Sequence, residues 1–226
     1  GPAALSLCRS VTAFPCRPSR LEERGHAKTT VKFRRGGLMR DESSVVAVDE
    51  ALKERILSVR LVIFDVDGVL TDGGITIHDD GSESKTFDVK DGHGIKLLQR
   101  CGLQAALISG RFCASVDHRA KGLGIEHVYQ GIHRKVEAYE KIKAATGLED
   151  RHMAYVGDDL IDIPVMRRVG FAVCVQDAVD HVKPYAHYVT KRPGGKGAAR
   201  EICELILQVQ GLWEGVTARY FQEDLG

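Results

Sequence analysis

Two carboxylates, Asp65 and Asp67, stand directly after the apolar run 61–64. Four consecutive apolar residues are typical of a strand that is buried on both faces of a parallel sheet, and Gly68 ends it. Ligands bind at the carboxyl ends of such strands. Because neighbouring carboxylates repel each other, the pair predicts a bound cation or a chemical task for both groups. The alternative is an ordinary Asp-rich turn at a strand end.

A second polar group, Ser109, Gly110 and Arg111, follows the predicted strand 104–108. A serine hydroxyl and backbone N–H groups at the start of a helix suit phosphate oxygens, because the helix dipole points there. The serine would equally be a common N-cap. Arg111 is a candidate ligand for an anionic substrate, since guanidinium pairs well with carboxylate and phosphate.

Two more strand ends carry charged residues. Lys135 lies near the start of a predicted helix, where a cation opposes the helix dipole, and this favours a functional role over a plain surface lysine. Asp158, Asp159 and Asp162 follow the next predicted strand. Three acids within this short segment predict a cation nearby, although a helix cap alone would explain Asp159.

The elements that would position these residues alternate between strand and helix from residue 91 onward. This alternation predicts βαβ units with right-handed connections, and therefore an α/β Rossmann-like three-layer sandwich around a central parallel sheet. The predicted strands are 61–64, 104–108, 127–129, 153–156, 171–175 and 188–190. The predicted helices are 44–60, 95–100, 112–121, 133–145, 160–168 and 197–209.

A β-hairpin is predicted over about 74–89. Two β-type runs, 75–78 and 85–89, flank Asp79-Asp80-Gly81, and an Asp-Gly pair between such runs is a strong hairpin signal. The hairpin would lie just beyond the Asp65 end of the sheet as a flap. A plain surface ribbon fits the same residues equally well.

Composition limits the classes of function. The 226 residues are 43% hydrophobic and 28% charged, and no apolar run approaches the ~20 residues that a membrane span requires. The net charge of +1 is unevenly distributed: residues 1–40 carry +7 (nine Lys or Arg against two Glu), and the remaining chain carries −6. The remaining chain therefore lacks the basic cluster of a nucleic-acid-binding protein. Six cysteines without metal-ligand spacing favour a reducing, cytoplasmic compartment. We therefore expect neither nucleic acid nor membrane as a partner.

Three regions are expected along the chain. Residues 1–40 are predicted to be a disordered leader or a cloning-derived extension, with Met39 as the expected natural start, because they lack an apolar period. Residues 41–212 would form the catalytic domain. Residues 213–226 look like a C-terminal tail.

All of these motifs together resemble the haloacid dehalogenase superfamily of phosphotransferases, over roughly residues 60–209. Within it the chain is similar to the bacterial 3-deoxy-D-manno-octulosonate 8-phosphate phosphatase family. The motifs that carry this narrower resemblance are Asp-Val-Asp-Gly-Val-Leu-Thr-Asp-Gly (65–73), Lys-Asp-Gly-His-Gly-Ile (90–95), Tyr-Gln-Gly (129–131), Gly-Asp-Asp-Leu-Ile-Asp (157–162) and Ala-His-Tyr-Val-Thr (186–190).

The resemblance implies a Rossmann-like core without a large cap domain. It also implies a homotetramer in which flap hairpins and C-terminal tails help to close neighbouring active sites. The implied activity is Mg²⁺-dependent removal of phosphate from a small sugar acid phosphate in lipopolysaccharide precursor synthesis. Val69 departs from the broader superfamily, where threonine is usual, but the phosphatase subfamily tolerates valine.

The expected mechanism assigns Asp65 as nucleophile and Asp67 as acid and base. Mg²⁺ would be held by Asp65, the Asp67 backbone carbonyl and Asp158. Ser109 and Lys135 would bind the phosphoryl oxygens.

Further residues would support the reaction. Asp162 would orient Lys135 or a metal-bound water from behind. Lys90, Gly110 and Arg111 would complete the substrate site together with Ser109 and Lys135. The glycine-rich loop 194–197 would meet the sugar carboxylate or form an ordinary turn, and both interpretations stay open.

Three alternatives compete with this interpretation. The closest is a phosphatase for a nine-carbon sugar acid phosphate. A non-catalytic phosphatase-like oligomerisation module is less favoured, since its acids would be expected to decay. A two-component receiver domain ranks last, because it would lack the paired Asp67.

Overall fold

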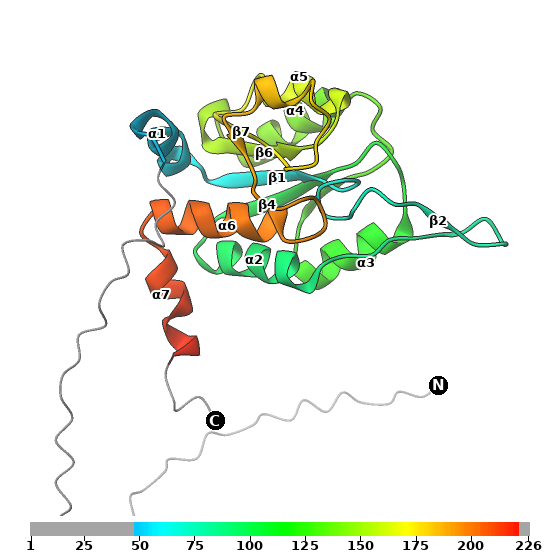
Figure 1. Cartoon of the computed structure of the whole chain (residues 1–226), viewed down its shortest axis with the longest axis horizontal. Helices are drawn as coiled ribbons and strands as arrows, with labels where there is room; N and C mark the ends of the chain where they lie inside the picture. Colours follow the sequence, from blue (N-terminus) through cyan, green and yellow to red (C-terminus); the bar gives the residue numbers. More distant parts are fainter. Residues whose placement is uncertain (1–47, 222–226) are drawn as a thin grey trace, which may run out of the picture. The chain divides into compact units, whose positions relative to one another are not determined.

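The computed structural model describes residues 48–221, and these contain a six-stranded parallel sheet (Figure 1). The strand order is β5-β4-β1-β6-β7-β8. This arrangement confirms the predicted α/β, Rossmann-like fold. The strands are β1 (Leu61–Asp65), β4 (Gln104–Ile108), β5 (His127–Tyr129), β6 (Met153–Gly157), β7 (Phe171–Cys174) and β8 (Tyr188–Val189).

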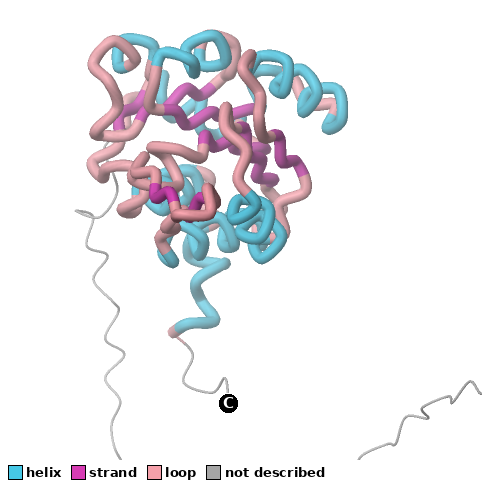
Figure 2. The backbone as a smooth tube through the Cα atoms, turned by 90° about the vertical axis from the view of Figure 1, so that its right-hand side faces the viewer, coloured by secondary structure: helices cyan, strands magenta, loops and turns pink. Residues whose placement is uncertain are grey.

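Helices cover both faces of the sheet, which makes the three layers visible in Figures 1 and 2. The helix layer changes face where the chain reverses its direction across the sheet, as a constant crossover hand requires. One face carries α2 (Val89–Arg100), α3 (Ala114–Leu123) and α6 (Ala198–Val209), and the other carries α4 (Lys135–Thr146) and α5 (Ile163–Met166). Short 3-10 turns are η2 (Asp150–His152), η3 (Leu160–Asp162) and η4 (Lys183–Tyr185).

Burial of the central strands explains why the sequence predicted them clearly. Every residue of β1, β6 and β7 is buried, as expected for strands covered on both faces. Burying one large side chain such as Phe64 stabilises the fold by roughly 1.5–3 kcal/mol. Helix α1 (Glu50–Ser58) precedes β1 and starts later than the predicted 44–60, because Asp49 caps it by accepting the N–H of Leu52 at 2.7 Å.

A small antiparallel hairpin, β2 (Thr76–Ile77) with β3 (Glu83–Ser84), lies between β1 and α2. Its turn is closed where the N–H of His78 donates to the carbonyl of Ser82 at 2.9 Å. The predicted second strand at 85–89 is wrong, since pairing ends at residue 84. Asp88 accepts the N–H of Lys90 at 2.5 Å and caps α2, which therefore starts at residue 89. The helix cap thus replaces the predicted strand. It also makes α2 begin well before the predicted 95–100. The described chain between β1 and α2 holds this hairpin and no cap domain.

The C-terminal segment is helical as far as the structure describes it. It forms α7 (Trp213–Thr217) and η5 (Ala218–Tyr220). The Tyr220 hydroxyl lies 3.0 Å from His93 Nε2 and accepts a hydrogen bond from Arg100 at 2.5 Å, so this segment packs on α2. The predicted extension 1–40 and residues 222–226 lie outside the described residues. Across 48–221, every helix falls short of the length and apolar character that a membrane crossing needs.

Candidate active site

The polar residues gather at the carboxyl ends of β1 and β6. The chain leaves β1 toward α2 on one face of the sheet and leaves β6 toward α5 on the other. A crevice opens where neighbouring connections diverge in this way, and it is the usual ligand site of open parallel sheets. Asp65 is the last residue of β1, and Asp158 follows β6 directly.

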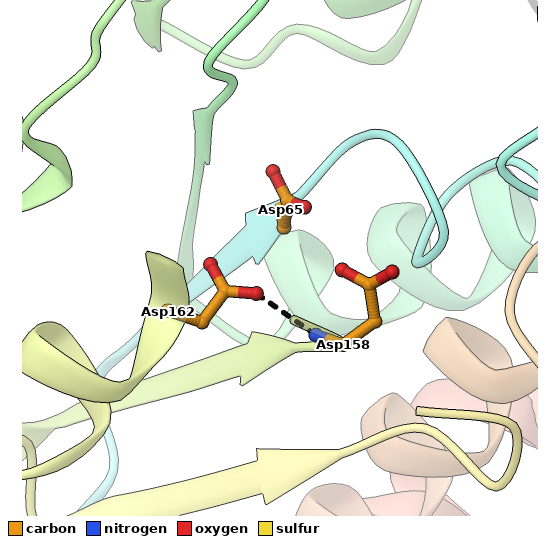
Figure 3. A group of neighbouring side chains, drawn as sticks. All are labelled: Asp65, Asp158 and Asp162. Atoms are coloured by element: carbon orange, nitrogen blue, oxygen red, sulfur yellow. Dashed lines mark hydrogen bonds between the residues drawn. The ribbon is translucent and has the colours of Figure 1, made fainter. Parts of the chain in front are cut away.

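Three carboxylates face one another in this crevice (Figure 3). One oxygen from each of Asp65, Asp158 and Asp162 lies within 4.8 Å of the other two. Asp65 is only 4% exposed and Asp162 is fully buried. Charged groups at such depth require either protons or cationic partners.

Lys135 supplies one cationic partner from the start of α4. Its ammonium is 2.8 Å from Asp65 Oδ1 and 2.6 Å from Asp162 Oδ1, and the side chain is buried. Burial lowers the lysine pKa, but the Asp65 and Asp162 carboxylates outweigh burial and leave the pKa raised. Lys135 is therefore a fixed positive charge beside the predicted nucleophile.

Asp162 is occupied by hydrogen bonds from the protein. Besides Lys135, its Oδ1 accepts the Tyr155 hydroxyl at 2.6 Å. Its Oδ2 accepts the backbone N–H groups of Asp158 at 2.9 Å and Asp159 at 3.1 Å. Four donors leave Asp162 suited to orienting its neighbours, whereas Asp65 and Asp158 present oxygens toward the crevice (Figure 3).

The donor set fits a hard divalent cation such as Mg²⁺, which prefers carboxylate oxygens. Burial, followed by repulsion from neighbouring carboxylates, raises the pKa of Asp65 to about 7 and that of Asp158 to about 8 in the metal-free protein. Gly68 makes room for this arrangement, because a Cβ there would meet Asp158 Oδ2 at 1.9 Å. The carboxylates thus form a cradle whose repulsion a cation would relieve.

Asp67 turns its side chain to other partners and is not in this carboxylate group. Its Oδ1 pairs with the ammonium of Lys85, and its Oδ2 accepts the Ser109 hydroxyl at 3.3 Å. Ser109 is buried at the end of β4, and its Oγ also accepts the N–H of Arg111 at 3.1 Å. The sequence did not predict Lys85 as a site residue. Its position in a hairpin expected near Asp65 was the only feature that could have indicated such a role.

The predicted substrate residues are only partly gathered. Gly110 lies between Ser109 and Arg111, and the Arg111 guanidinium is 2.5 Å from Glu83 Oε1 on the hairpin. Lys90 is exposed and lines a separate cavity of about 690 Å³ that includes none of the clustered carboxylates. Another cavity, of about 650 Å³, lies near Gln104 at the amino end of β4, away from the clustered carboxylates. Cavity size therefore does not identify the site.

The loop 194–197 packs against the segment that follows Asp65. A Cβ on Gly194 would lie 1.7 Å from the Gly68 carbonyl oxygen. All four backbone N–H groups of the loop already donate within the protein, so the loop is a buttress rather than a carboxylate site. The acceptors are Asp177 Oδ1 for Gly194 (2.9 Å), Val69 O for Gly195 (2.9 Å), Pro193 O for Lys196 (3.3 Å) and Asp91 Oδ2 for Gly197 (3.2 Å).

Comparison with known proteins places this geometry among phosphatases. Residues 122–202 match the family model for haloacid dehalogenase-like hydrolases. The chain is 46% identical over 164 residues to 3-deoxy-D-manno-octulosonate 8-phosphate phosphatase KdsC from Yersinia pestis, covering 73% of this chain and 88% of the relative.

Solved structures agree with the sequence comparison. The crystal structure of the Yersinia pestis phosphatase superposes with a TM-score of 0.73 at 45% identity, covering 74% of this chain and 91% of that one. The corresponding phosphatase from Moraxella catarrhalis, solved in complex with magnesium ion, phosphate ion and KDO, gives a TM-score of 0.73 at 39% identity, covering 75% and 97% of the two chains.

Proposed function

Because this chain belongs to the 3-deoxy-D-manno-octulosonate 8-phosphate phosphatase family of haloacid dehalogenase-like hydrolases, we propose that it hydrolyses this sugar phosphate to the free sugar acid and inorganic phosphate. It is a phosphoric monoester hydrolase that acts in lipopolysaccharide precursor synthesis. The observation that carries the proposal is the Asp65, Asp158 and Lys135 cluster at the β1/β6 crevice. A carboxylate nucleophile, a cation cradle and a fixed ammonium are the parts that phosphoryl transfer needs.

The proposed reaction has two steps. An Asp65 oxygen attacks phosphorus in line, the bond from phosphorus to the sugar oxygen breaks, and an aspartyl-phosphate forms. Asp67 donates a proton to the departing sugar oxygen. Asp67 then removes a proton from the water that attacks the aspartyl-phosphate, which releases inorganic phosphate and restores Asp65.

Charge on the phosphoryl oxygens is balanced by groups that are already in place. Lys135 would bind these oxygens without reorganising, since it is buried and held by two carboxylates, and the buried Ser109 hydroxyl would turn its one proton toward them. We assign Mg²⁺ to Asp65, Asp158 and the Asp67 backbone carbonyl, with Asp162 behind them. When bound, the metal neutralises charge between the nucleophile and the anionic substrate.

Recognition of the sugar acid is proposed for the rim of the site. Arg111 and Gly110 border the crevice beside Ser109, and the guanidinium suits a carboxylate. Lys90 is kept as a more distant candidate. We also propose a cytoplasmic homotetramer. The buried thiols of Cys113, Cys174 and Cys203 fit a reducing compartment.

Phosphate release from a panel of sugar phosphates tests the function. Hydrolysis of 3-deoxy-D-manno-octulosonate 8-phosphate in Mg²⁺, abolished by chelation and by Asp65→Asn, is the expected result. Faster turnover of a nine-carbon sugar acid phosphate would reassign the substrate, and inactivity toward the whole panel would favour a non-catalytic oligomerisation module. Light scattering of the same preparation tests the tetramer.

A further inference from the structure

Lys85 is a buried lysine outside the predicted machinery. It follows β3 in the hairpin, and its side chain is only 2% exposed. Lysine is rarely buried to this degree unless it is paired, because removing an ammonium from water is costly. Its ion-pair partner within residues 48–221 is Asp67, the proposed acid and base.

Asp67 has its charged partner at one carboxylate oxygen. Lys85 pairs with Oδ1, whereas the Ser109 hydroxyl shares its one proton between Oδ2 at 3.3 Å and the nearer Arg111 carbonyl at 2.9 Å. The Asp67 side chain is 21% exposed and sits on the segment after β1. Without the fixed Lys85 donor such a side chain would rotate among staggered conformers, and only some of these would point at the reacting ester.

The hairpin that carries Lys85 is itself attached to the site. Glu83 on β3 pairs with Arg111 at 2.5 Å, and its backbone carbonyl lies 3.7 Å from the Cys113 thiol. Both contacts join the hairpin to the segment after β4, which also carries Ser109. The docked hairpin therefore fixes the position of Lys85 relative to Asp67 and Ser109.

We propose that Lys85 is a positioning residue that aims the Asp67 carboxyl group at the leaving-group oxygen, so that docking of the hairpin completes the acid and base. The inference rests on the proposed phosphatase function and adds a residue to it. Proton transfer requires a distance of about 2.6–3.2 Å between heavy atoms, so a carboxyl group free to rotate would transfer the proton inefficiently.

Comparison of two esters tests the role. An alkyl ester such as the sugar phosphate needs a proton on its leaving oxygen, whereas p-nitrophenyl phosphate loses a stable phenolate without one. In Lys85→Met, kcat/KM for the sugar phosphate should fall about 10- to 100-fold and that for p-nitrophenyl phosphate less than about 3-fold. Lys85→Arg, which keeps the charge, should recover part of the loss.

The ratio of the two kcat/KM values is measured in one preparation, so it does not depend on the fraction of protein that folds. If Lys85→Met yields no protein, Glu83→Gln, which loosens the hairpin, should lower kcat for the sugar phosphate more than kcat for p-nitrophenyl phosphate. The comparison uses kcat because Glu83 also pairs with Arg111, a proposed substrate residue. Lys53→Met, on the exposed surface of α1, is the matched control and should leave the ratio unchanged.

Two outcomes would overturn the proposal. Equal losses for both esters would show that Lys85 serves the phosphoryl group or the fold, and a raised KM at constant kcat would make it a substrate ligand. Failure of the wild-type protein on the octulosonate ester would refute the proposed substrate alone. The Lys85 comparison would then use whichever alkyl phosphate of the panel is hydrolysed. Hydrolysis of none of them would refute the role together with the proposed function, because no leaving group would then receive a proton from Asp67.

Discussion

The Asp91 carboxylate, inside α2, accepts the backbone N–H of Arg200 in the first turn of α6 at 2.7 Å. Its other oxygen accepts the N–H of Gly197 at 3.2 Å. One buried side chain thus caps a helix from a different part of the chain. Because the loop 194–197 braces the segment after Asp65, the same carboxylate links α2 to the position of the proposed nucleophile.

Asp91→Ala should therefore destabilise the protein by about 1–3 kcal/mol, because the buried N–H of Gly197 and the partly buried N–H of Arg200 lose their acceptor. Urea unfolding monitored by circular dichroism measures the change. Asp180→Ala is the control, since Asp180 forms only an exposed pair with Lys183 and its loss should cost less than about 0.5 kcal/mol. Equal effects of the two substitutions would contradict the capping role.

Gly194→Ala should lower kcat while leaving the secondary structure intact. The new Cβ would lie 1.7 Å from the Gly68 carbonyl oxygen, and both partners are backbone, so the segment after Asp65 must shift. A small misplacement of a nucleophile costs about 100-fold in rate. Gly122→Ala on α3 is the matched control, because nothing lies within 4 Å of its Cβ position, and its kcat should stay unchanged.

The metal-free protein should become less stable as pH rises from 5 to 8.5. Without metal, burial and carboxylate repulsion raise the pKa of Asp65 to about 7 and that of Asp158 to about 8, from 3.8. The folded state then binds more protons than the unfolded state over this range, so the free energy of unfolding falls with pH. Thermal unfolding in chelator measures the trend, and Asp158→Asn should flatten it.

Mg²⁺ should raise the melting temperature more at pH 8.5 than at pH 6, because protons and the cation compete for the same oxygens. Titration of Mg²⁺ during thermal unfolding gives the shift at each pH. A shift of the same size at both values, or one that survives Asp158→Asn, would place the metal elsewhere.

Lys135→Met should reduce kcat about 100- to 1000-fold, the usual effect of removing one group that stabilises transition-state charge. The substitution also leaves the buried Asp162 without its cation, so the unfolding free energy should fall. Steady-state kinetics and urea unfolding separate the two effects. The exposed Lys143, paired with Asp150, provides Lys143→Met as a control with little effect on kcat.

Much of the fold was predictable because the signals were local and repeated. The continuous apolar run of β1 and the alternation of strands with helices predicted the parallel sheet, and every strand of the sheet lies within two residues of its expected bounds. The hairpin's second strand was misplaced because the Asp88 cap competes with a β-type run, and the balance depends on how α2 packs. Residues 1–40 lie outside the described part, so their predicted character stays a prediction.

The sequence by itself determined which chemical groups meet, because the carboxyl ends of parallel strands converge whatever the details of packing. Asp65, Ser109, Lys135 and Asp158 could be placed at one edge on that ground alone. Only the tertiary structure decided what each oxygen binds. Asp162 is filled by four donors and Asp67 is paired with Lys85, because hydrogen-bond partners and burial depend on segments that lie far apart in the sequence.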